Sequence, residues 1–310
     1  MILLFVFTGC DTNKGKVKMD EASSMYISFT TTYEKDKKFL IDVLYLNLDS
    51  KKVDKITTIP YESQYPLAVY DKNADKVYYS SETKDKAGSK AGDQLFEYDI
   101  NTHKVKQLTT DLYAINYIIP TSDAIYLAAR PIDSRVEQPY IIHKGNDKVI
   151  KLTWDPDLYV WNMNIDPQTD TVVLSGYSSK ERDEEIANQE NKPFEYGINS
   201  IHLLTQNKHR IIKKTAHGNM NSIWFDEKHD INYIIDGESK HIDDSNKESE
   251  LELSNDIHTD NIMYSSKNGI YYLDGDQQIC YYDKINREEI VLYKTKANSA
   301  INNAQILNEK

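Results

Sequence analysis

Short apolar runs separated by polar turns recur along the whole chain and predict β-strands. One repeated element is a polar turn that ends in Asp or Asn and leads into a β-branched residue and further apolar or aromatic residues. Its clear copies are residues 75–79, 123–127, 170–174 and 268–272. A looser copy is residues 230–234, and residues 25–28 fit the strand without its turn. The element therefore occurs six times.

Most copies are followed by a second element, an apolar strand, a tight polar turn and another strand, which is the pattern of a β-hairpin. These hairpins cover residues 44–56, 95–108, 140–152, 200–212 and 279–292. The two elements together make a four-stranded unit, and its copies at Val77, Ile125 and Val172 are spaced by 48 and 47 residues. Four strands in about 40 to 50 residues make a blade of a β-propeller. We therefore predict an all-β fold, a six-bladed β-propeller of four-stranded antiparallel blades.

The two ends of the chain fit a single blade. The chain begins with what reads as the second strand of a blade, and residues 299–307 read as an innermost strand. A ring closed by pairing the N- and C-terminal strands removes exposed sheet edges. The fifth unit is short and polar through residues 236–253, and we expect it to be the weakest blade. A β-sandwich pair or an open array of sheets is the alternative, and the regular spacing argues against both.

Connections between the second and third strands are longer than the other turns. The long ones are residues 31–39, 81–93, 130–138 and 178–197. In a propeller these connections and the links between blades lie on one face, around the mouth of the central channel. Long loops that a fold does not need are where functional residues accumulate, so we expect function at this face. Residues 180–189 are compatible with a short surface helix, and a solvated loop is the alternative.

Aromatic residues stand at matching places where blades begin. Tyr65, Tyr113 and Tyr159 are spaced by 48 and 46 residues. Near them in the pattern are Trp161, His217, Trp224 and His258. Rings around a channel mouth can stack on a sugar or clamp a peptide, so these seven residues are the candidate ligand-binding residues. The alternative is that these rings fill the core between blades.

The N-terminus has the features of an export signal. An apolar run over residues 2–7 ends in Phe7-Thr8-Gly9-Cys10, after which the chain turns polar. These four residues resemble a bacterial lipobox, and the resemblance implies a diacylglycerol on Cys10 and cleavage just before it. No Lys or Arg precedes the run, which indicates a truncated leader and a true start codon further upstream. The alternative is an ordinary first strand.

The resulting division of the chain has three parts. Residues 1–10 are the signal peptide with its lipobox, residues 11–22 are a tether, and residues 23–308 are a single β-propeller domain. We therefore expect an exported protein that is lipid-anchored to the outer face of the bacterial cell membrane.

Composition and motifs narrow the chemistry. A net charge of −12 without a basic stripe argues against DNA or RNA as a partner. Cys10 and Cys280 are the two cysteines of the chain, so acylation of Cys10 leaves Cys280, within an apolar-aromatic run, without a disulfide partner. The sequence has no Gly-rich phosphate loop, no His-Glu-x-x-His, no Gly-x-Ser-x-Gly and no cysteine pair at zinc spacing. We expect no catalytic residue, no metal and no cofactor.

Short strands with Tyr-Tyr and Asp-rich turns, repeated six times behind a lipobox-like leader, resemble the TolB-like six-bladed β-propellers of bacterial envelope proteins. The resemblance implies a binding module in an envelope complex, although some related propellers are lyases or hydrolases of glycans or peptides. Two functions stay open at this point. One is a membrane-tethered module that binds a protein, peptide or cell-envelope ligand with its long-loop face, and the other is an extracytoplasmic glycan- or peptide-active enzyme.

Overall fold

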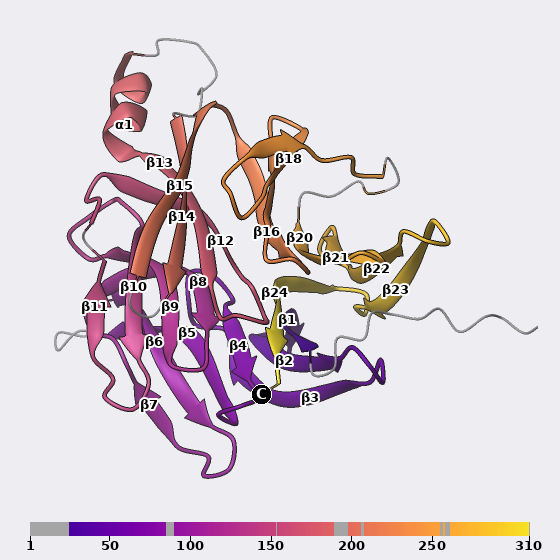
Figure 1. Ribbon diagram of the computed structural model, residues 1–310. Coiled ribbons are helices and arrows are strands. Elements are labelled where there is room, and N and C mark those ends of the chain that lie inside the picture. The colour runs from indigo at the N-terminus through magenta and orange to yellow at the C-terminus, as the bar shows by residue number, and fades with distance from the viewer. Residues whose placement is uncertain are drawn as a thin grey trace, which may run out of the picture.

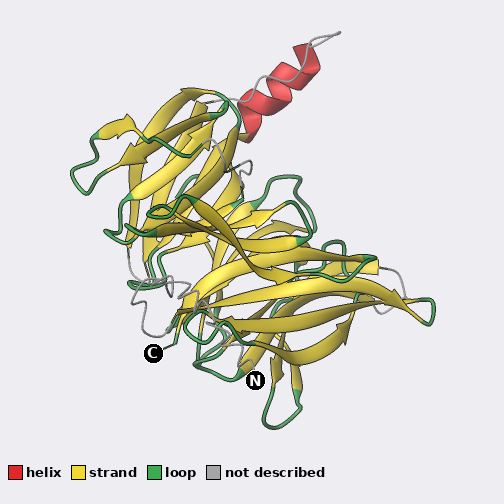
Figure 2. Cartoon of the chain, turned by 90° about the vertical axis from the view of Figure 1, so that its right-hand side faces the viewer, coloured by secondary structure: helices red, strands yellow, loops and turns green. Residues whose placement is uncertain are grey.

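The computed structural model describes residues 25–84, 90–152, 154–188, 198–205, 208–254, 257 and 261–309. In this part of the chain the elements are the strands β1 to β24 and the helix α1 (Figures 1 and 2). The predicted leader and tether, with Cys10, lie outside the described residues. The prediction of an all-β fold with four-stranded antiparallel sheets is confirmed.

The first sheet is built from both ends of the chain. In spatial order its strands are β24 (Ser299–Asn308), β1 (Met25–Lys35), β2 (Lys38–Asn47) and β3 (Val53–Pro60). β24 and β1 pair antiparallel from Met25 opposite Asn308 to Tyr33 opposite Ser299. The C-terminal strand predicted from residues 299–307 is therefore hydrogen-bonded to the first described strand of the chain.

The next three sheets have four strands each, paired antiparallel in chain order. The second sheet holds β4 (Ala68–Asp71), β5 (Lys76–Lys84), β6 (Lys90–Asp99) and β7 (Val105–Gln107). The third holds β8 (Leu112–Pro120), β9 (Ala124–Pro131), β10 (Gln138–His143) and β11 (Val149–Lys151). The fourth holds β12 (Leu158–Ile165), β13 (Val172–Ser178), β14 (Ile198–Thr205) and β15 (Lys208–His217), with α1 (Ser179–Asn188) between β13 and β14.

The last sheet has eight strands and two similar halves. One half is β16 (Met220–Asp226), β17 (Ile231–Ile235), β18 (Glu238–Ile242) and β19 (Glu248–Glu250). The other is β20 (Ile262–Ser265), β21 (Gly269–Asp274), β22 (Gln278–Asp283) and β23 (Glu288–Lys294). Each half is antiparallel, and the halves join through two residue pairs of a parallel ladder between β16 and β20. The unit predicted to be the weakest thus has all four strands, of which the last is short and exposed.

The strands β24, β4, β8, β12, β16 and β20, here called the inner strands, lie next to one another in that order, and β20 in turn contacts β24. Buried aromatic residues fill the space between sheets. The Tyr26 hydroxyl on β1 donates to the carbonyl of Tyr70 on β4 at 3.2 Å and accepts from the Lys72 amide at 3.0 Å. Neighbouring sheets are thus joined through ring packing and satisfied polar atoms.

The long connections differ from their prediction in two places. Residues 31–39 form the ends of β1 and β2, joined by a tight turn at Asp36 and Lys37, whose φ angles of 52° and 63° fit a two-residue hairpin turn. Strands also extend into residues 81–93, because β5 continues to Lys84 and β6 begins at Lys90. The backbone of both segments therefore carries strand pairing that the sequence interpretation assigned to loops.

Of the two readings of residues 180–189, the structure shows the helix. α1 lies above β13 in Figure 1, and Figure 2 shows this helix projecting away from the sheets. Its start is held by Asp157, whose carboxylate accepts from the Lys180 amide at 2.9 Å and from the Ser179 hydroxyl at 2.8 Å. The Ser178 hydroxyl caps the helix by accepting from the Glu181 amide at 3.1 Å. These contacts dock the N-terminus of α1 to the start of β12.

Candidate functional site

A cavity of about 660 Å³ opens where the links between sheets and the connection from β9 to β10 meet. This volume is in the range of sites for small molecules. We call it the mouth cavity, and its lining residues are Tyr65, Pro66, Leu67, Asn116, Tyr117, Glu137, Tyr159, Trp161, Asn162, Asn219, Asn221 and Asn302.

Four of these side chains come from β-bulges in the inner strands. Strand pairing skips Asn116 in β8, Trp161 in β12, Asn221 in β16 and Asn302 in β24. A bulge adds one residue to a strand, breaks the strict in-and-out alternation and redirects a side chain. The same irregularity in successive inner strands therefore supplies the cavity with side chains that regular strands would place elsewhere.

Tyr159 and Trp161 form an aromatic side of the mouth cavity, and both pack against a third ring, that of Tyr177. Tyr177 stacks on Tyr159 with ring centroids 5.2 Å apart and planes 9° apart, and lies 5.9 Å from Trp161. The guanidinium of Arg182, from α1, lies 5.0 Å from the centroid of Tyr159. Trp161 keeps 36% of its surface exposed and Tyr65 keeps 45%, so both rings are available to a ligand.

Glu137 is the carboxylate of the mouth cavity, and it is 7% exposed. The Asn116 side-chain amide donates to its Oε1, and the Tyr159 hydroxyl also hydrogen-bonds to it. Burial raises the pKa of Glu137 to about 7, against the opposing effects of Arg130, these hydrogen bonds and Arg182. This carboxyl group therefore changes charge near neutral pH.

Side-chain amides make up much of the remaining wall. The carbonyl oxygens of the Asn116 and Asn219 side chains are buried without a hydrogen-bond partner in the described chain. A buried acceptor without a donor costs free energy, so a ligand that brings a hydroxyl or N–H to these atoms gains affinity.

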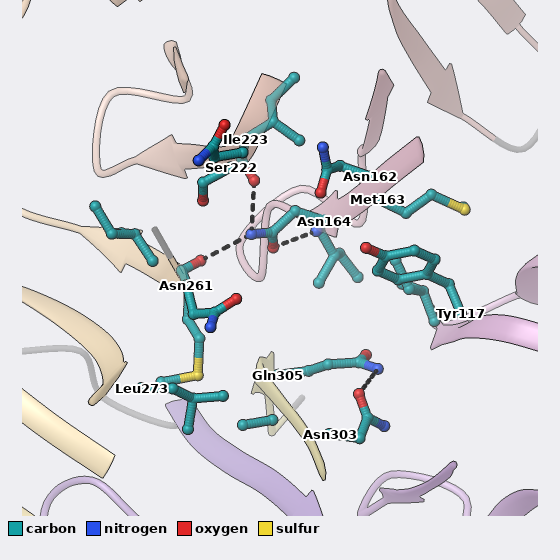
Figure 3. Close-up of a pocket in the computed structure, with 16 residues that line it drawn as sticks. Tyr117, Asn162, Met163, Asn164, Ser222, Ile223, Asn261, Leu273, Asn303 and Gln305 are labelled. Carbon is teal, nitrogen blue, oxygen red and sulfur yellow. Dashed lines mark hydrogen bonds between the residues drawn. The ribbon is translucent and has the colours of Figure 1, made fainter. Parts of the chain in front are cut away.

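Below the mouth cavity a narrower cavity of about 120 Å³ continues between the inner strands, and the two share Tyr117, Asn162 and Asn221. Figure 3 shows Asn164 at its centre, where the side-chain amide donates to the carbonyls of Ile223 at 3.0 Å and Met263 at 3.3 Å. The Asn164 side chain thus hydrogen-bonds β12 to β16 and β20. This lower cavity is too small for more than a few water molecules, so only the mouth cavity above it has room for a larger molecule.

A neighbouring cavity of about 400 Å³ is more acidic. Its lining residues are Tyr61, Glu62, Ser63, Gln64, Glu82, Gly92, Asp93 and Tyr113. The buried Asp93 carboxylate accepts from the Gln64 amide at 2.7 Å, and the Arg130 guanidinium lies 4.3 Å from the centroid of Tyr113. Arg130 thus stands beside this cavity and also interacts with the Glu137 carboxylate of the mouth cavity.

The seven residues proposed from the sequence fall into different places. Tyr65, Tyr159 and Trp161 line the mouth cavity together, whereas Tyr113 lines the acidic cavity beside it. The placement of Trp224 at the channel mouth is wrong, because its side chain is fully buried in the core. Its indole N–H donates to the Ser265 hydroxyl at 3.2 Å.

The side chains of the two proposed histidines lie outside the described part of the structure. The backbone of His217 ends β15, opposite Ile198, and His258 lies outside the described residues. The sequence interpretation also missed Glu137 and the amides. Asn116 interrupts an otherwise apolar inner strand, and Asn162 and Asn221 stand beside large apolar residues in theirs, which is the signal that could have identified them.

Two groups of potential metal ligands occur among the described residues, both outside the mouth cavity. In the first, Asp226, Asp230 and His241, the Asp226 carboxylate already accepts the backbone amides of Lys228 and Asp230 in a hairpin turn. In the second, Asp274, Cys280 and Glu289, burial raises the pKa of the free Cys280 thiol to about 12, and the Glu289 carboxylate accepts from the Tyr272 hydroxyl.

No protein-family model and no curated protein sequence matches the chain. Its structure is similar to a chain in the crystal structure of a nidogen/laminin complex, with a TM-score of 0.58 and 12% identity over 91% of this chain and 98% of the other. That structure contains a β-propeller. The likeness and the four-stranded sheets together show that this protein has a β-propeller fold. In the described part of the chain, the helix is too short and too polar to cross a membrane.

Proposed function

We propose that this protein is an extracytoplasmic, membrane-tethered binding module that uses the mouth cavity to bind a protein, peptide or cell-envelope ligand. The observation that carries the proposal is the cavity itself. Exposed rings of Tyr65 and Trp161 stand beside buried amide oxygens that have no partner in the described chain. A binding site combines such apolar surfaces with a few convergent polar atoms.

The finer architecture in this proposal is a closed ring of six blades of the TolB-like type. The antiparallel halves of the eight-stranded sheet count as two blades in this arrangement. The pairing of β24 with β1 and the contact of β20 with β24 support closure. A closed ring holds the inner strands at fixed positions, which gives a rigid wall to the mouth cavity.

Lipid attachment at Cys10 and a location on the outer face of the bacterial membrane complete the proposal. Their support is the lipobox-like Phe7-Thr8-Gly9-Cys10. Mass spectrometry of the N-terminal peptide from the native host tests this directly. A diacylglycerol on Cys10 that disappears in Cys10→Ser is expected, and an unmodified Cys10 contradicts the anchor without touching the cavity.

Affinity capture of the anchored protein from its native envelope tests the binding role. The wild type is compared with Tyr65→Ala and Trp161→Ala, and Phe39→Ala serves as a control because Phe39 is also an exposed ring but does not line the cavity. Loss of the same partner from both cavity variants and its retention by the control are expected. Recovery of identical partners by all four proteins would reject the mouth cavity as the binding site.

Glu137 provides a specific observation in favour of the second candidate, a glycan- or peptide-active enzyme. A carboxyl group with a pKa of about 7 is suited to general acid–base catalysis. Glycoside hydrolysis by the common mechanism needs two carboxyl groups, and the described lining of the mouth cavity holds one. Turnover of an envelope glycan or peptide that Glu137→Gln abolishes, with binding retained, would establish the enzyme over the binding module.

A further inference from the structure

We propose that the group held in the mouth cavity is an uncharged saccharide residue of the ligand. This inference rests on the proposed binding function and names the chemistry of the group that the cavity accepts. It follows from three properties of the cavity: its charge, its hydrogen-bonding atoms and its exposed rings.

The charge of the cavity favours a neutral group. Glu137 is its one carboxylate among the described lining residues, and the guanidinium groups of Arg130 and Arg182 both interact with that carboxylate. Arg182 already occupies a position over the Tyr159 ring, where a ligand cation would otherwise bind. A cationic group is repelled by the two guanidiniums, and an anionic group has to compete with Glu137 for them, which leaves the buried Glu137 carboxyl without its counter-charges. An uncharged group meets neither penalty.

The hydrogen-bonding atoms require a ligand rich in donors. The side-chain oxygens of Asn116 and Asn219 are buried without a partner in the described chain, and the Glu137 carboxylate adds further acceptor capacity. The Asn116 side-chain N–H group donates to Glu137, so the oxygen is the atom of this side chain that has no partner in the described chain. Vicinal hydroxyl groups of a sugar supply several donors within the span of one ring. Each acceptor satisfied in this way recovers a desolvation cost.

The exposed rings suit the apolar face of a sugar ring. Trp161 and Tyr65 border the cavity with open surface, and Tyr177 fixes the Tyr159–Trp161 pair from behind. The C–H groups on one face of a pyranose are apolar, and they pack on the electron-rich face of an aromatic ring while the hydroxyls at its rim reach polar atoms. A rigid ring also loses little conformational entropy on binding.

An extended peptide fits the inner strands less well. Peptides that bind through their backbone add a strand to an exposed sheet edge. The inner strands surround a cavity of about 120 Å³, which has no room for another strand. Peptide binding is therefore the competing outcome of the test.

The test is titration of the full chain, kept in detergent, with short neutral oligosaccharides, a uronic-acid oligosaccharide and uncharged peptides, followed by calorimetry and saturation-transfer NMR. We expect a neutral oligosaccharide to bind with its ring protons saturated by aromatic protons of the protein. Trp161→Ala and Asn219→Ala should each weaken binding by about tenfold or more, and the control Phe39→Ala should leave it unchanged.

The outcomes separate this inference from the proposed function. Binding of peptides or of the uronic-acid oligosaccharide in preference to every neutral oligosaccharide overturns the saccharide assignment and leaves a binding module. Absence of binding by all neutral oligosaccharides also overturns it. If, in addition, envelope partners are captured equally by wild type and Trp161→Ala, the proposed function of the mouth cavity fails as well. Unfolding curves of each variant show that a lost affinity is not a lost fold.

Discussion

Trp161 and Trp224 occupy the inner strands of neighbouring units and have opposite environments. Trp161 in β12 is 36% exposed and borders the mouth cavity, whereas Trp224 in β16 is 0% exposed and lies in the core. Both strands contain a bulge at corresponding places, but the residue skipped by pairing is Trp161 in β12 and Asn221 in β16. Trp224 stays within regular pairing, opposite Asn232. In these two strands the register, and not the residue type, decides whether the ring is buried in the core or borders the mouth cavity.

The largest effect expected from this comparison is the cost of removing the buried ring. Trp224→Ala leaves a large cavity in the core and an unpaired Ser265 hydroxyl, so we expect it to lower the free energy of unfolding by about 3 to 5 kcal/mol. Urea unfolding followed by circular dichroism measures this. Trp224→Phe, which retains most of the ring volume, should lose clearly less. A loss below about 1 kcal/mol for Trp224→Ala would contradict the buried placement.

The next effect concerns Glu137 in the mouth cavity. Unlike the cost of removing Trp224 from the core, its effect on the free energy of unfolding depends on pH. Its pKa is raised from 4.5 to about 7 by burial, so the folded protein holds this proton more tightly than the unfolded chain. The resulting stabilisation is complete below the unfolded pKa and is lost as the pH rises through about 7. It amounts to at most about 3 kcal/mol.

Glu137→Gln keeps the shape of the side chain and removes this titration. We therefore expect the free energy of unfolding of the variant, relative to wild type, to rise by up to about 3 kcal/mol between pH 4 and pH 8. Thermal unfolding across this pH range measures the difference. A difference that is flat with pH, or that falls as pH rises, would show that Glu137 is not the buried carboxyl described above.

The repeat could be predicted from the sequence because its turns and strands depend on residues that are close together in the chain. Asp75 and Asp170 end the hairpin turns with φ angles of 50° and 59°, a conformation that Asp tolerates better than most residues. Tyr and β-branched residues then fill the paired strands. The same local signals gave the wrong result for residues 31–39, where a two-residue turn joins long strands.

The mouth cavity was only partly readable, since it depends on contacts between distant residues. Glu137 lies far from Asn116 and Tyr159 in the chain and gains its properties from burial beside them. Bulges have no reliable signature in a single sequence. The sequence therefore predicted the same environment for Trp161 and Trp224. The pattern of rings at blade entries therefore selected three residues that line one cavity, Tyr65, Tyr159 and Trp161, but gave Trp224 the wrong environment.

A smaller effect is expected at Gly176, which lies beneath the aromatic side of the cavity. A Cβ added at this position would lie 2.3 Å from the carbonyl oxygen of Tyr159 and 2.6 Å from Cδ1 of Leu158. Gly176→Ala must therefore push β12 away from β13, at a cost of about 1 to 3 kcal/mol. Chemical unfolding gives the cost, and near-ultraviolet circular dichroism reports the disturbed packing of Tyr159 on Tyr177. An unchanged spectrum at unchanged stability would mean that the two strands lie further apart than the pairing of Val160 with Gly176 requires.

The smallest effect on stability is expected at Trp161 itself, and it makes the comparison with Trp224 decisive. Its ring keeps open surface and its side chain stands outside the regular ladder, so Trp161→Ala loses contact with Tyr159 and Tyr177 but leaves no closed cavity. We expect a loss of about 1 kcal/mol or less in the same urea experiment. The ring should also respond to ligands, because a sugar or peptide stacked on it changes its fluorescence, and this change should vanish in the variant. A loss of stability as large as that of Trp224→Ala would mean that Trp161 is also part of the core. The contrast between a buried ring and a ring that borders the cavity would then fail.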